Sequence, residues 1–256
     1  MASIGTGYDL SSTTFSPDGR VFQVEYAAKA VENSGTCVGL RCTDGVVLAV
    51  EKAVISKMLV QGTLRRSHIV ARHATLTVCG LISDGRVIVD HARAEAEQYK
   101  DFYGRPIPGH VLADRIAHFV HVYTLHWHVR PFGCAVLLGV ADVDGPQLYL
   151  IEPSGLSYRY YACAFGKAKA AARTELEKLK LNGSDGKALI SCDEGVKELA
   201  KILVKVHDES KDKDTELEMI TVTDGKDGGA KLVPRKVVEE AHAAAKAFLE
   251  ADDMED

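Results

Sequence analysis

The order of its predicted secondary-structure elements constrains this chain more than any other feature of its sequence. Two groups of β-branched and apolar runs are joined by turns rich in Gly, Asp and Pro, and two amphipathic helical segments follow each group. The strand-like runs span 36–40, 46–50, 75–79, 134–140, 147–151 and 156–161. Strands joined by short turns pair antiparallel, and helices that come in pairs cover sheet faces. The pattern predicts an α+β domain without an obvious linker.

The predicted helices carry apolar residues at spacings of three and four. These stripes lie within 89–103, 112–123, 168–179, 196–206 and 237–248, the last after Pro234, and a further strand is expected at 216–222. A shorter helix at about 20–32 precedes all the strands and has its stripe at Val21, Val24, Ala28 and Val31. It is too short to be stable alone, so we expect it to pack on another surface.

Composition excludes several classes of function. The 256 residues suit one large domain or two small ones, and a net charge of −5 leaves no basic surface for nucleic acid or anionic lipid. The longest apolar run, 134–141, is far short of the roughly 20 residues that cross a bilayer. We therefore expect a protein that binds neither nucleic acid nor membrane.

Neither a metal nor another cofactor is expected. The cysteines at 37, 42, 79, 134, 163 and 192 form no CxxC pair, and we interpret them as reduced core residues. His118 and His121 lie one helical turn apart, but no acidic or Cys spacing supplies a third metal ligand. Phe165-Gly166-Lys167-Ala168 lacks the first glycine and the hydroxyl of a phosphate-binding loop.

One motif near the N-terminus matches a known family at many positions and restricts the possible function further. The segment Phe15–Ala27, which reads FSPDGRVFQVEYA, follows Gly7-Tyr8-Asp9 and resembles the N-terminal signature of eukaryotic proteasome α-type subunits. The resemblance covers nearly the whole chain. It continues at Gly35-Thr36, Gly80-Leu81, Arg130-Pro131-Phe132-Gly133 and Glu152-Pro153-Ser154-Gly155.

The resemblance implies a four-layer αββα sandwich of the N-terminal-nucleophile hydrolase type. Residues 1–14 would be a mobile gate tail, 15–249 a single αββα domain, and 250–256 an acidic C-terminal tail. It also implies a non-catalytic subunit of the seven-membered α ring of the proteasome core particle, in the cytoplasm and nucleus. Its partners would be other α subunits, β subunits and regulatory complexes in ATP- and ubiquitin-linked protein degradation.

Fold relatives of this family cleave peptides with an N-terminal Thr, whose own amino group helps to take the proton. By the same resemblance, Gly35 occupies the nucleophile position, Glu51 the acid position and Arg66 the position of the catalytic lysine. Glycine has no hydroxyl, and Arg is a poor base. We therefore expect no catalytic residue. The alternative is a threonine peptidase subunit, which would require removal of residues 1–34, and a weaker one is an adaptor that binds clients through its acidic tail.

The resemblance also assigns candidate site residues. Tyr8, Asp9, Pro17 and Tyr26 match a cluster that holds the open conformation of the gate. Arg66, with Gly80 and Leu81 nearby, matches a pocket between adjacent α subunits, where a cation pairs with the terminal carboxylate of an activator.

Overall fold

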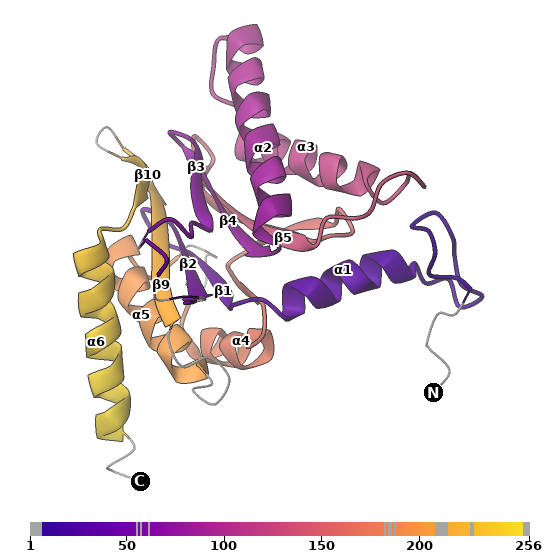
Figure 1. The fold of residues 1–256 in the computed structure, drawn as a ribbon. Helices are drawn as coiled ribbons and strands as arrows, with labels where there is room; N and C mark the ends of the chain where they lie inside the picture. The colour runs from indigo at the N-terminus through magenta and orange to yellow at the C-terminus, as the bar shows by residue number, and fades with distance from the viewer. Residues whose placement is uncertain are drawn as a thin grey trace.

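The chain forms two stacked antiparallel sheets with helices on both outer faces, as Figure 1 shows. The computed structural model describes residues 7–54, 56, 58–60, 62–181, 183, 186, 188–207, 215–225 and 228–252, of which 250–252 are described by backbone alone. Residues 1–6 of the predicted gate tail and 253–256 of the predicted acidic tail lie outside this set.

The first sheet has the strand order β10-β9-β2-β1-β8. Its strands are β1 Cys37–Arg41, β2 Gly45–Ala53, β8 Ala162–Phe165, β9 Thr215–Thr223 and β10 Gly229–Leu232. The turn at Thr43-Asp44-Gly45 joins β1 to β2 as an antiparallel hairpin, which confirms the sequence interpretation.

The second sheet has the order β3-β4-β5-β6-β7. Its strands are β3 Ser67–Ala71, β4 Ala74–Gly80, β5 Cys134–Asp142, β6 Gly145–Ile151 and β7 Ser157–Tyr160. Because each strand pairs antiparallel with its sequence neighbour through a short turn or across the helix pair, this sheet follows a simple meander.

The helices form the two outer layers, except for one that extends away from the sandwich. They are α1 Phe22–Glu32, α2 Ile82–Tyr103, α3 Gly109–Val122, α4 Lys169–Lys178, α5 Cys192–Val206 and α6 Arg235–Asp252. Helices α2 and α3 cover the second sheet, and α4, α5 and α6 cover the first, whereas α1 extends sideways from the sandwich (Figure 1). The four-layer αββα architecture is therefore confirmed.

Side chains alternate between the two faces of each strand, so buried residues fill the space between the sheets and also the space between each sheet and its helices. In β2, Val46, Leu48 and Val50 point into the layer between the sheets, whereas Val47 and Ala49 point toward the helices. Both sets are completely buried, because this strand is covered on both faces. Such a strand reads as a continuous apolar run, as it does in the sequence.

Three strand assignments were wrong or missing. The predicted strand at 156–161 is two strands, β7 and β8, which belong to different sheets, so the chain crosses the sandwich edge at Tyr161. Strands β3 and β10 were not predicted. Both are edge strands with half-exposed residues, and an edge strand carries a weak apolar pattern.

Candidate functional site

The approach to α1 is a tight turn at Ser16-Pro17-Asp18-Gly19. The Gly19 amide donates to the Ser16 carbonyl at 2.9 Å, with Pro17 at the position where its fixed φ suits such a turn. Ser16 Oγ accepts from the Arg20 amide at 3.0 Å, and Gly19 has φ +76°. Hydrogen bonds within the turn therefore stabilise it, and its geometry sets the direction in which the chain enters α1.

Asp9 joins the N-terminal segment to α1. Its Oδ2 accepts a hydrogen bond from Tyr26 Oη at 3.2 Å, and its carbonyl accepts one from the Gln23 side chain. Partial burial and the hydrogen bond to Asp9 raise the pKa of Tyr26, so the phenol stays protonated and remains a donor. Two of the four predicted gate residues are thus in direct contact.

The structure does not join Tyr8 and Pro17 to that pair by polar contacts. Both side chains are exposed, and among the described residues no hydrogen bond or ring contact links either to Asp9 or Tyr26. The four gate residues lie on one segment around the base of α1, but within this chain the hydrogen-bonded unit is Asp9, Gln23 and Tyr26.

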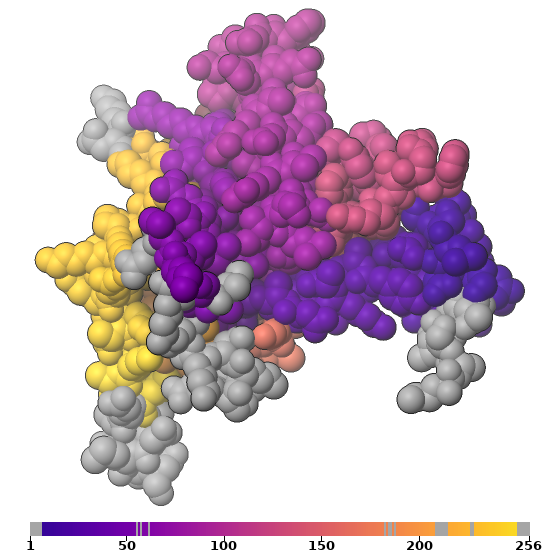
Figure 2. Space-filling model, viewed as in Figure 1, coloured from indigo at the N-terminus to yellow at the C-terminus, as the bar shows by residue number. Residues whose placement is uncertain are grey.

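The N-terminal segment rests on the loop after α3. Ser12 is buried there, and its Oγ donates to the His126 carbonyl at 3.3 Å. Figure 2 shows the indigo segment against the rose-coloured residues that follow α3. Large apolar side chains in both parts are exposed, with Leu10 at 89%, Phe15 at 70% and Trp127 at 80%.

The other end of α1 packs against β4 and β5, beside the loop at 130–133. Asp84 accepts two hydrogen bonds from the Arg130 guanidinium, at 2.6 and 2.9 Å, and a third from the Gly133 amide at 2.9 Å. The hydrogen bonds from Arg130 lower the pKa of the Asp84 carboxyl. Gly133 in turn accepts from the Leu81 amide at 2.9 Å. This loop therefore links the base of α2 to the predicted docking residues.

Arg66, Gly80 and Leu81 lie together, as the sequence predicted. Arg66 Nη1 donates to the Gly80 carbonyl at 2.9 Å and to the Val78 carbonyl at 3.4 Å. Gly80 has φ +116°, and a Cβ there would lie 2.3 Å from the Gly133 carbonyl oxygen, so glycine is required at this position. The Leu81 side chain is 46% exposed beside it.

The hydrogen bonds of the Arg66 side chain to the described residues use one edge of its guanidinium. Both of its side-chain hydrogen bonds use Nη1, and toward the described residues Nε and Nη2 make none. Nε and Nη2 form the fork that binds a carboxylate through two parallel hydrogen bonds. Arg20 uses this fork in the same chain, because its Nε donates to Glu25 Oε1 at 2.7 Å and its Nη2 to Oε2.

The nucleophile position cannot hold a side chain. A Cβ at Gly35 would lie 2.2 Å from the Glu51 carbonyl oxygen, which belongs to the backbone and cannot move aside. Thr36 is 1% exposed, and its Oγ1 accepts from the Ala168 amide at 3.4 Å. A Thr at position 35 would therefore require a different backbone.

Glu51, the residue in the acid position, contacts a histidine. The Glu51 carboxylate contacts His207 Nδ1 at the end of α5, and both groups are largely buried. Arg66 contacts strand carbonyls. The residues in the three catalytic positions thus do not form a nucleophile paired with a base.

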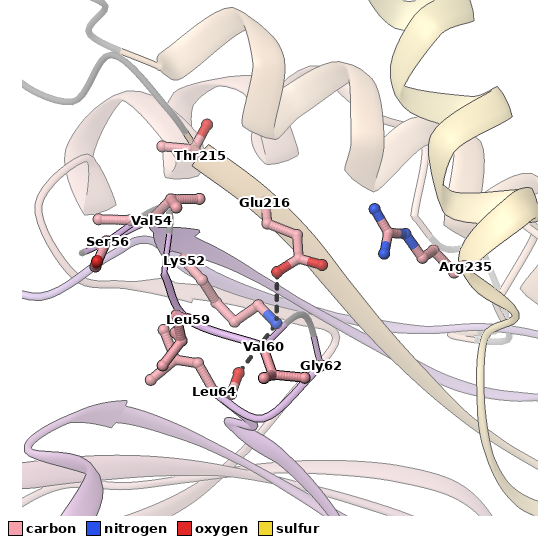
Figure 3. Close-up of a pocket in the computed structure, with 11 residues that line it drawn as sticks. Lys52, Val54, Ser56, Leu59, Val60, Gly62, Leu64, Thr215, Glu216 and Arg235 are labelled. Atoms are coloured by element: carbon pink, nitrogen blue, oxygen red, sulfur yellow. Dashed lines mark hydrogen bonds and ion pairs between the residues drawn. The ribbon is translucent and has the colours of Figure 1, made fainter.

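Sequence reasoning missed a buried cation next to Glu51. Lys52 is 3% exposed, and its Nζ donates to Glu218 Oε2 at 2.9 Å and to the Leu64 carbonyl at 3.0 Å. Glu216 Oε2 lies 3.4 Å from the same nitrogen. Lys52, Leu64 and Glu216 line a cavity of about 350 Å³ (Figure 3). The available signals in the sequence were a lysine at the end of an apolar strand run and, far from it, two glutamates at strand spacing, and neither indicates that the three residues meet.

The cysteines are structural. All six are free and buried, as predicted. Burial raises the pKa of the thiols of Cys37, Cys134 and Cys163, that of Cys163 to about 12, so these thiols stay protonated.

The described part of the chain contains no group of three or more His, Cys, Asp and Glu side chains placed to hold a metal ion. Within the same residues, every helix is too short or too polar to span a lipid bilayer.

Comparisons with known proteins agree with this geometry. Residues 31–222 match the family model described as "Proteasome subunit", and residues 8–30 match the model of the N-terminal signature of A-type proteasome subunits. The alpha type-3 proteasome subunit of Spinacia oleracea is 56% identical over 255 residues, which cover 100% of both chains. The Drosophila melanogaster protein of that name is 47% identical, covering 100% of this chain and 98% of that one. The probable alpha type-7 proteasome subunit of Schizosaccharomyces pombe is 44% identical over 99% of this chain and 97% of its own.

Proposed function

The chain belongs to the proteasome α-type subunits, the non-catalytic ring components of the core particle, and on that premise we propose that its N-terminal segment forms part of the axial gate. The hydrogen bond from Tyr26 to Asp9 carries this proposal. It connects residues 17 apart in the sequence, so it can set the exit direction of the tail from the helix. Other proteasome subunits are the partners of the chain.

Opening and closing of a gate require two states of similar free energy. A single hydrogen bond to a charged acceptor at an accessible site has a suitable strength, because it can be exchanged for contacts with a neighbouring tail. The side chains of Tyr8 and Leu10, which are 42% and 89% exposed, support the same conclusion, since exposed apolar groups often belong to contact surfaces. We assign them to contacts with adjacent α subunits in the seven-membered ring.

The second part of the proposal concerns regulatory complexes. The Arg66 fork, beside the exposed Leu81, would receive the C-terminal carboxylate of an activator tail. Arg presents two parallel donors where Lys presents a point charge, so this pocket should select strongly for a free carboxylate over an amide. The chain would thereby serve ATP- and ubiquitin-linked proteolysis in the cytoplasm and nucleus, which fluorescent tagging of the subunit would test.

The gate proposal is tested with Asp9→Ala in assembled core particles. Activator-stimulated peptide hydrolysis should fall, because the tail loses its anchor in the open state, whereas hydrolysis without activator should change little. Asp18→Ala is the matched control, an exposed Asp in the turn of the same segment. Unchanged stimulation across a panel of activators would overturn the proposal.

A further inference from the structure

We propose that Glu218, held by the buried Lys52, is the positioning residue that sets Arg66 for its carboxylate ligand. The inference rests on the proposed docking function of Arg66 and extends it to the opposite sheet. Glu218 lies on β9 of the first sheet, whereas Arg66 directly precedes β3 of the second.

Glu218 binds the backbone on which Arg66 is carried. Its Oε1 accepts from the Arg66 amide at 3.1 Å and from the Ser67 amide at 2.6 Å. A carboxylate that accepts two backbone amides fixes the orientation of that peptide unit through charge-assisted hydrogen bonds. The direction in which the Arg66 side chain leaves the backbone is thereby set.

Lys52 completes the arrangement from the other side. Its Nζ bonds to Glu218 Oε2 and to the Leu64 carbonyl, so the segment 64–67 is held at both ends by one ion pair. Leu64 and Lys52 both line the cavity in Figure 3, so close packing does not surround this segment on that side. Polar contacts therefore carry more of its positioning than they would in a filled core.

Stability alone is a poor explanation for this ion pair. The side chains of Lys52 and Glu218 are 3% and 12% exposed, and burial of two charges costs about as much free energy as their attraction returns. Apolar residues of similar size would hold strands β2 and β9 together as well or better. What apolar residues cannot do is orient the amides of Arg66 and Ser67, which is the property that a bidentate carboxylate site needs.

Glu216 provides a matched control within the same cluster. Its Oε2 is 3.4 Å from the same Lys52 nitrogen, but it is 33% exposed, and Glu218 is the acid that accepts from the Arg66 amide. If the acids act only through the charge of Lys52, replacement of either acid should alter carboxylate binding. If the effect passes through the backbone of Arg66, only replacement of Glu218 should alter it.

The test uses assembled core particles and a photo-cross-linking peptide with the C-terminal sequence of an activator, made with a free carboxylate and as the amide. The apparent Kd of each peptide is measured from the yield of cross-links to this subunit. Arg66→Gln should abolish the preference for the carboxylate. Glu218→Gln should weaken carboxylate binding roughly three- to tenfold and leave amide binding unchanged. Glu216→Gln should stay within about twofold of the unmodified chain, as the loss of a partly exposed pair predicts.

The outcomes separate the two proposals. If Arg66→Gln lowers the carboxylate preference and Glu218→Gln behaves like Glu216→Gln, docking at Arg66 stands and the positioning role is wrong. If Arg66→Gln has no effect, the docking function itself is wrong, and the positioning role is wrong with it. A parallel loss of carboxylate and amide binding in Glu218→Gln would show general damage and would also contradict positioning.

A second variant covers the case in which Glu218→Gln prevents assembly. Glu218→Asp keeps the charge but withdraws the carboxylate by one methylene from the Arg66 and Ser67 amides. It should reduce the carboxylate preference in the same direction, and an unchanged preference would overturn the inference.

Discussion

Helices α1 and α5 differ in how they are held, although each follows a turn and is amphipathic. Helix α5 starts with a capping box, in which Ser191 Oγ accepts from the Glu194 amide and Glu194 accepts from the Ser191 amide. It buries residues along a full face, including Leu199 and Leu203. Helix α1 starts at Phe22 after Val21, which provides no side-chain cap, and it buries Phe22, Ala27 and Val31.

The difference separates a helix whose position this chain determines by itself from the helix to which we assign a role in gating. Helix α5 is stabilised by local capping and by the core between helices and sheet, so its position is determined within this chain. Of the buried residues of helix α1, only Val31 belongs to the core between the sheets, and hydrogen bonds connect the helix to the segment before it. An element that must respond to partners needs this lower local stability.

The largest effect is expected from a core change in α5. Leu199→Ala should lower the free energy of unfolding by about 3 kcal/mol, because Leu199 is completely buried and the change leaves a cavity. Val24→Ala in α1 should lower it by less than about 1 kcal/mol, since Val24 is half-buried. Urea unfolding of the purified chain measures both. Equal losses of unfolding free energy in the two variants would show that α1 and α5 do not differ in how strongly the chain holds them.

The next effect concerns Asp84, which binds the loop at 130–133. Asp84→Asn should cost about 2 kcal/mol, because hydrogen bonds from Arg130 lose their charged acceptor. The folded pKa of Asp84 is lower than its ordinary value of 3.8, so its stabilisation is complete above that value and is lost as the pH falls toward the folded pKa. Unfolding titrations below pH ~5 should therefore show a smaller acid-induced loss for Asp84→Asn than for the unmodified chain. Identical acid profiles would count against this assignment.

A smaller effect is expected at the cap of α5. Ser191→Ala should lower the free energy of unfolding by about 1 kcal/mol, since the Glu194 amide loses its acceptor. Hydrogen exchange of the first-turn amides of α5 would locate the effect. A rise in exchange spread evenly over the chain would contradict a capping role.

The smallest change in stability is expected for Tyr26→Phe in α1, which removes the donor to Asp9 and keeps the ring. The unfolding midpoint should stay close to that of the unmodified chain, while activator-stimulated hydrolysis by assembled particles should fall. Tyr158→Phe on β7 is the control, because that side chain is 57% exposed and distant from α1 in sequence. If Tyr26→Phe lowered the unfolding midpoint but left activator-stimulated hydrolysis unchanged, Tyr26 would stabilise the fold and would have no role in gating.

Most of the fold was accessible from local patterns. Strands such as β2 and β5 are continuous apolar runs because both of their faces are covered, and the turns at Asp44-Gly45 and Asp144-Gly145 join them to their partners. The weak points were edge strands and the crossing at Tyr161, where pairing partners far apart in sequence decide the assignment. In α1 the predicted stripe placed Val24 and Ala28 inside, but both are half-buried, because the helix touches the sandwich mainly at its C-terminal end.

The candidate site was predicted in part. The proximity of Arg66 to Gly80 and of Asp9 to Tyr26 followed from the family resemblance, and the structure places both pairs in contact. Lys52 and Glu218 were missed because they are 166 residues apart, and no local pattern indicates that two charges meet inside a sandwich. The roles of these residues in gating and docking remain predictions.

The sequence by itself determined the alternation of paired helices and strands, the glycine at position 35 that excludes a nucleophile, and the signature that identifies the family. These are local properties, since they depend on residue type and on spacing along the chain. The tertiary structure alone decided that Nη1 of Arg66 is bound to strand carbonyls, while its Nε and Nη2 bond to none of the described residues, and that an acid from the opposite sheet holds its backbone. Hydrogen-bond geometry depends on which groups meet after the sheets stack, and that juxtaposition has no signature in any short stretch of chain.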